Sequence, residues 1–121
     1  MAELKKLEED GETEHPEERR ESQVQEVQTL LELATRALVD FPDEVRVQVV
    51  AGDRLVIFEV RVAPIDVKRL IGRKGRTADA LRELLLGLGG KVRARFLLEI
   101  IEPTHRVEEI RLPRPREASA K

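Results

Sequence analysis

The sequence predicts an α+β domain with the element order helix-strand-strand-helix-helix-strand. Three observations predict it. Apolar residues first recur at helical spacing, then alternate with polar residues, and then return to helical spacing on both sides of a turn bracketed by glycines. A last alternating stretch follows. These patterns cover, in order, residues 24–38, 45–49, 54–62, 64–88 and 92–100.

Composition indicates one small domain with charged flanks. The chain has 121 residues, of which 38% are charged and 40% hydrophobic. Nine acids face four bases in residues 1–24, and large aliphatic residues are scarce at the start, so we expect an acidic disordered arm over 1–22. Three prolines and mixed charge predict a disordered Pro/Arg tail over 103–121. The domain is then expected at 23–102.

The absence of certain residues and runs excludes several classes of protein. With no cysteine, the chain has no disulfide, thiolate nucleophile or cysteine metal site. The first residues are too acidic for a signal peptide. No apolar run approaches the roughly 20 residues that span a bilayer. We expect a cytoplasmic protein that does not enter a membrane.

A first helix is predicted by an apolar stripe, with Ser22 as its N-cap. The helix is expected to end at Phe41, because a residue before proline is pushed out of the helical region. The stripe consists of Val24, Val27, Leu31, Ala34 and Leu38.

Two strands follow as an antiparallel hairpin around the turn at 51–53. The second and third strands are separated by two helices, which is enough chain for a parallel crossover. The second strand should therefore be central in a mixed three-stranded sheet, with all three helices on its apolar face. The face expected to meet solvent carries Arg46, Gln48, Glu59, Arg61, Arg93 and Arg95.

The turn between the last two helices is the strongest candidate site. Gly72 and Gly75 bracket Arg73 and Lys74, and residues 68–82 contain six bases and one acid. Glycine allows close approach of a ligand, and the free N–H groups at a helix start favour anions. Pro64 suits the start of the preceding helix, and Gly89-Gly90 suits the end of the following one.

This turn is expected to hold the phosphates of single-stranded RNA while unstacked bases lie on aliphatic side chains. With no Tyr or Trp and three Phe, an aromatic stacking platform is not expected. Two alternatives remain open: the glycines make a plain tight turn between packed helices, or Val67, Leu70 and Ile71 are all core. The expected RNA-binding residues are Val67, Lys68, Ile71, Gly72, Arg73, Lys74, Gly75 and Arg76.

Residues 62–82, which include Leu-Ile-Gly-Arg-Lys-Gly-Arg-Thr, resemble the region around the GxxG loop of a KH domain. The element order is that of the type II KH fold. From Val24 to Glu102 the chain resembles the small bacterial stand-alone KH proteins of the KhpA family. The flanking segments depart from that compact pattern.

The resemblance implies cytoplasmic RNA binding through the GxxG loop. It also implies self-association as a homodimer, or pairing with a larger Jag/KhpB-type protein that joins a KH domain to a second nucleic-acid-binding domain. A role as a post-transcriptional regulator or RNA chaperone linked to cell-division and cell-shape control follows from it. We expect no cofactor and no small-molecule substrate.

Other functions are less well supported by the residues. His15 and His105 lie outside the expected core, the Walker spacing is missing, and we expect neither catalysis nor a metal site. A protein-interaction module that keeps this fold is the main alternative, because helix 24–38 is rich in apolar residues. A DNA-reading helix-turn-helix ranks low, because the helix after the turn offers few donors for base edges.

Overall fold

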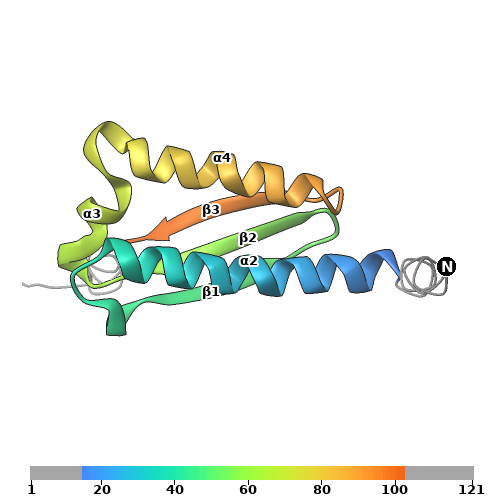
Figure 1. The fold of residues 1–121 in the computed structure, drawn as a ribbon, viewed down its shortest axis with the longest axis horizontal. Coiled ribbons are helices and arrows are strands. Elements are labelled where there is room, and N and C mark those ends of the chain that lie inside the picture. The colour runs from blue at the N-terminus through green and yellow to red at the C-terminus, as the bar shows by residue number, and fades with distance from the viewer. Residues whose placement is uncertain (1–14, 103–121) are drawn as a thin grey trace, which may run out of the picture.

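The computed structural model describes residues 15–102, and these residues have the predicted order of elements (Figure 1). Three short 3₁₀ turns, at Pro42–Glu44, Pro64–Asp66 and Arg73–Gly75, join some of them. The helices and strands are α2 (Pro16–Leu38), β1 (Arg46–Ala51), β2 (Leu55–Arg61), α3 (Val67–Ile71), α4 (Arg76–Gly90) and β3 (Arg95–Ile101).

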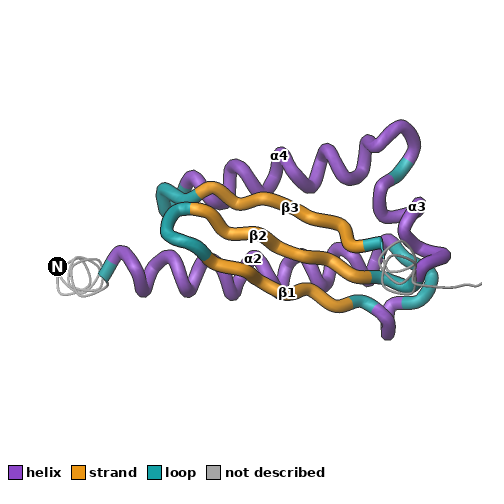
Figure 2. Tube along the Cα trace, turned by 180° about the vertical axis from the view of Figure 1, so that it is seen from behind, coloured by secondary structure: helices purple, strands orange, loops and turns teal. Residues whose placement is uncertain are grey.

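The sheet has the strand order β1-β2-β3, so that β2 is central. β1 pairs with β2 antiparallel, with Val47 opposite Val60, and β2 pairs with β3 parallel, with Val56 opposite Phe96. All three helices lie on one face of the sheet, and the view from behind shows the other face uncovered (Figure 2). The predicted mixed sheet and its one-sided helical cover are confirmed.

The core lies between that face and the helices. Phe58 and Phe96 are fully buried at its centre, with ring centroids 5.1 Å apart and planes inclined by 64°. Edge-to-face pairs of this kind add stability beyond the area that they bury. Around them pack the buried side chains of Val27, Leu31, Val45, Val47, Val56, Val60, Leu70, Leu85 and Leu98.

The start of α2 differs from the prediction. Its N-cap is His15, and the helix begins at Pro16, so Ser22 is not a cap and residues 16–22 are helical. Proline suits the first helical position, and the backbone N–H of His15 donates to the Glu18 carboxylate at 3.4 Å. Expectations for residues 1–14, and for 103–121 with His105, lie outside the described residues.

The start of β3 also differs. Helix α4 continues to Gly90, and residues 91–93 form a turn in which Arg93 has φ 58°. The strand therefore begins at Arg95 rather than at Val92. Arg93, which was expected on the uncovered face of the sheet, lies instead in this turn.

Close packing requires glycine at position 89. A Cβ atom added there would lie 2.5 Å from the Ala94 carbonyl oxygen and 2.9 Å from Cγ of Phe96. A Cβ atom at Gly87, in the same helix, would meet nothing within 4 Å. The close approach of α4 to the start of β3 thus requires glycine at position 89 alone of these two.

Two substitutions in α4 should therefore shift stability in opposite directions. We expect Gly89→Ala to destabilise the fold by about 1–3 kcal/mol, since it overpacks the core at Phe96. Gly87→Ala should stabilise it by about 0.5–1 kcal/mol through helix propensity. Urea unfolding followed by circular dichroism measures both, and equal effects at the two positions would contradict this account.

Candidate nucleic-acid interface

The candidate loop joins α3 to α4 at one end of the molecule (Figure 1). Gly72, Lys74 and Gly75 have φ values of 83°, 55° and 77°, which reverse the chain within a few residues. The Gly72 N–H donates to the Lys68 carbonyl at 2.8 Å, and the Gly75 N–H donates to the Gly72 carbonyl at 3.0 Å. The loop is a closed turn whose shape is set by its own backbone.

The two glycines are required for different reasons. Gly72 combines a positive φ with close packing, because an added Cβ atom would lie 2.8 Å from Cβ of Thr77 and 2.9 Å from its backbone nitrogen. At Gly75 an added Cβ atom would meet nothing within 4 Å, so only φ favours glycine there. The open space beside Gly75 leaves the backbone accessible to a ligand.

Lys74 is an exposed side chain on a left-handed backbone. This conformation costs an L-residue other than glycine roughly 1–2 kcal/mol. Sequence reasoning assigned positive φ to the glycines alone. Such local strain is concentrated in proteins at functional sites, and here it projects an ammonium group from the middle of the loop.

The start of α4 has no side-chain cap. Gly75 is its N-cap, and the Arg76 N–H donates to the Arg73 carbonyl of the preceding 3₁₀ turn. The first N–H groups of a helix have no acceptor within the helix itself, and the helix dipole is positive at this end, which favours an anion there. Arg76 stands in the first turn and is exposed.

Ion pairs divide the six cations of residues 68–82 into two groups. The Arg69 guanidinium lies 3.2 Å from the Asp40 carboxylate, and that of Arg82 lies 3.1 Å from Asp79. The other four are exposed and form no ion pair within residues 15–102; they are Lys68, Arg73, Lys74 and Arg76. The structure thus brings the four predicted cations together around the loop with their charges uncompensated.

The aliphatic residues before the loop take different positions. Leu70 is fully buried and belongs to the core. Val67 is half-buried and packs against the core, and Ile71 is half-buried at the last position of α3. Of the three, Val67 and Ile71 keep exposed surface beside the loop.

An apolar cavity of about 210 Å³ between α4 and β3 was not singled out from the sequence. One of its lining residues, Arg82, lies about 9 Å along the helix axis from Arg76 at the loop, since each residue adds 1.5 Å. The sequence contained a signal for this cavity, because Leu86 is apolar but falls outside the apolar stripe of its helix. The cavity is lined by Arg82, Leu86, Arg95, Phe96, Leu97 and Leu98.

The buried carboxylate of Asp66 fixes the position of α3, and therefore that of the loop that follows it. Asp66 is 1% exposed, and its two oxygens accept hydrogen bonds from the backbone N–H groups of Asp40 and Phe41 at 3.0 and 2.9 Å. Arg69 adds the ion pair to Asp40 and lies 4.0 Å from Asp66. The Asp66 oxygens thus bind the chain that leaves α2.

Two further kinds of feature are absent from the described residues. Within 15–102, no three or more His, Cys, Asp or Glu side chains group as metal ligands. None of the helices over the same residues combines the length and the apolar character needed to cross a membrane.

Removing the Asp66 carboxylate should loosen the junction of α2 and α3. We expect Asp66→Ala to destabilise the fold by about 3 kcal/mol, because two buried N–H groups lose a charged acceptor. The matched control is Asp79→Ala, which breaks an exposed ion pair and should cost less than about 1 kcal/mol. Thermal unfolding measures both, and a similar loss in the two variants would contradict the role of Asp66.

Comparison with known proteins places this loop in a family. Residues 28–100 match the family model described as KhpA/KhpB, KH domain. The chain is 42% identical over 73 residues to an RNA-binding protein KhpA of Aquifex aeolicus, covering 60% of this chain and 92% of the relative.

Two further relatives carry the same name. That of Clostridium acetobutylicum is 43% identical over 72 residues, covering 60% of this chain and 96% of the relative. That of Mycobacterium leprae is 49% identical over 61 residues, covering 50% and 76%. No solved structure matches the chain.

Proposed function

The chain belongs to the KhpA/KhpB KH-domain family, and on that basis we propose that it binds single-stranded RNA through the loop at Gly72–Gly75. The observation that carries this proposal is the set of four uncompensated cations around an uncapped helix start. KH domains clamp the backbone of about four nucleotides with a GxxG loop. The names of the relatives support the same ligand.

Each residue of the loop has a part in this proposal. Gly75, beside which an added Cβ would meet nothing, lets the sugar-phosphate backbone approach the chain. Arg73 and Lys74 contact phosphates, and Lys68 and Arg76 extend the positive field on either side. Val67 and Ile71 offer the half-buried aliphatic surface on which the first bases rest.

Base contacts would be mainly aliphatic. Phe58 and Phe96 are fully buried in the core and cannot stack on a base, so that Phe41, which is 51% exposed, is the one phenylalanine with surface to offer. The cavity beside Leu86 and Leu98 provides further apolar surface between α4 and β3. Phosphate contacts carry no sequence information, so a site of this kind should bind RNA with low sequence specificity.

In the cell, the protein would act in the cytoplasm as a post-transcriptional regulator or RNA chaperone. A link to cell-division and cell-shape control is part of the same proposal. Both rest on the resemblance described above rather than on the geometry of the site.

Reversing the charge of the loop should weaken binding. We expect Arg73→Asp with Lys74→Asp to reduce affinity for an unstructured oligouridylate by at least about tenfold. The slope of log affinity against log salt should fall by about 0.7 for each phosphate that the variant no longer binds. Filter binding at several salt concentrations measures both quantities.

The matched control is Arg46→Asp with Arg61→Asp, which changes net charge equally on the uncovered face of the sheet. This control should lose far less affinity. If the loop variant remains folded and binds as tightly as the unchanged protein, the proposed mechanism is wrong.

A second candidate function is protein–protein association, and exposed leucines favour it. Leu30 and Leu33 on α2 are 41% and 59% exposed, and Leu84 and Leu86 on α4 are 47% and 45% exposed. A homodimer, or a heterodimer with a larger Jag/KhpB-type protein, would cover such surface. A dimer with two loops would also gain avidity on one RNA.

Association should therefore be visible without RNA. We expect analytical ultracentrifugation to show a concentration-dependent dimer that Leu84→Glu or Leu33→Glu weakens, because a charge would enter the interface. A chain that stays monomeric at high concentration, and with which no protein co-purifies from cells, would exclude this second function.

A further inference from the structure

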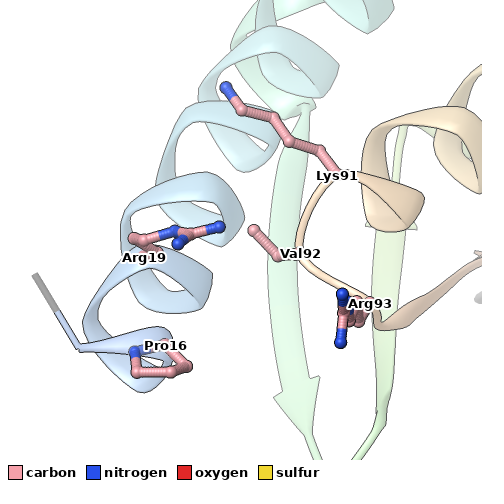
Figure 3. Close-up of a pocket in the computed structure, with 5 residues that line it drawn as sticks. All are labelled: Pro16, Arg19, Lys91, Val92 and Arg93. Atoms are coloured by element: carbon pink, nitrogen blue, oxygen red, sulfur yellow. The ribbon is translucent and has the colours of Figure 1, made fainter. Parts of the chain in front are cut away.

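A second group of cations lies at the end of the molecule opposite the GxxG loop. A cavity of about 250 Å³ opens there between the start of α2 and the turn that follows α4. Figure 3 shows Arg19 reaching from α2 towards the turn, Lys91 reaching back towards α2, and Val92 lying between Arg19 and Arg93. Pro16 completes the wall.

More cations adjoin this cavity. A neighbouring depression of about 170 Å³ shares Pro16, Val92 and Arg93 with it and adds Arg20 and Arg54, together with the carboxylates of Glu17 and Asp53. We name the five cations Arg19, Arg20, Arg54, Lys91 and Arg93 the distal cluster. Within residues 15–102, none of the five forms an ion pair. The cluster therefore concentrates positive charge that the described fold does not neutralise.

Hydrogen bonds hold the backbone segments that carry the distal cluster. The Gln23 side-chain amide, one turn beyond Arg19, donates to the Leu88 carbonyl at 2.8 Å and joins α2 to the last turns of α4. The Val92 and Ala94 N–H groups both donate to the Gly89 carbonyl at 3.0 Å. The Arg20 guanidinium donates to the Asp53 carbonyl. Because the backbone that carries these cations is held in place, binding an anion does not require that backbone to become ordered.

We propose that the distal cluster is a second phosphate-binding site, which takes the RNA backbone beyond the nucleotides that the GxxG loop holds. This inference rests on the proposed function. The loop and the cluster lie at the two ends of α4, which is about 22 Å long. Arg95 at the start of β3 provides a cation between them, beside Arg82, which is paired with Asp79. Lysine and arginine are donors only, as backbone phosphates require.

The acidic residues 1–14 of the same chain are an alternative ligand for the distal cluster. Residues 1–14 contain six acids and two bases, and they join the described chain at His15. A nucleic-acid backbone releases condensed counterions when cations bind it, which adds to its affinity for a cation cluster. We therefore assign the cluster to RNA, and the test below separates the two ligands.

The test compares a short and a long RNA. The full chain and the double variant Lys91→Gln with Arg93→Asn are titrated with oligouridylates of about four nucleotides and about three times that length. Asparagine tolerates the positive φ of residue 93, so the turn is kept. The matched control, Arg46→Gln with Arg61→Gln, removes the same charge from the uncovered face of the sheet.

We expect the variant to bind the short RNA as the unchanged chain does and the long RNA about three- to tenfold more weakly. Its salt slope on the long RNA should fall by about 1.4, for two phosphate contacts. Equal affinities of variant and unchanged chain for the long RNA would overturn the second site. Loss of short-RNA binding by Arg73→Asp with Lys74→Asp reports on the loop separately, so the two proposals fail independently.

A further variant reports on the acidic residues. Glu8, Glu9, Asp10, Glu12 and Glu14 are neutralised to their amides in the full chain. If these carboxylates hold the cluster, this variant should gain affinity for the long RNA, whereas Lys91→Gln with Arg93→Asn should lose none. That pair of results would overturn the assignment to RNA.

Discussion

The buried carboxylate of Asp66 is the contact on which the placement of the loop depends. It accepts hydrogen bonds from two successive N–H groups just beyond α2, while its own backbone leads directly into α3. Helix α3 has only five residues, so its direction is set by how its first turn is held. One side chain thus fixes the end of a long helix, the start of a short one and the position of Gly72–Gly75 relative to the sheet. Arg69 reinforces the junction from outside.

Helices α3 and α4 use different residues for packing and for the exposed charges around the loop. Leu70 and Leu85 face the core, and Arg69 is used in the junction with Asp40. Lys68 and Arg76, one on each helix, are exposed and have no ion-pair partner in the part of the chain that the structure describes. Because the two sets do not overlap, charges around the loop can change while the packing that holds α3 and α4 in place is kept.

Local patterns determined what could be predicted from the sequence. The element order, the central β2 and the glycine-bracketed turn between α3 and α4 follow from periodicity and short connections, and all three are confirmed. The early start of α2 was missed although its signals, Pro16 and Glu18, were local. The role of Asp66 could not be predicted, because its partners lie more than one element away. The distal cluster draws on three segments that are distant in sequence, and no period joins them.

The backbone of Lys74 has a consequence for how such a domain would respond to selection. Its φ of 55° is one that glycine or asparagine adopts more cheaply, and none of the described ion pairs uses its ammonium group. The chain therefore keeps a lysine that lowers its folding stability. Selection for heat resistance alone would favour replacing it, and the charge at the tip of the loop would disappear with it. If Lys74 contacts RNA as proposed, thermostability and RNA affinity are opposed at this single position.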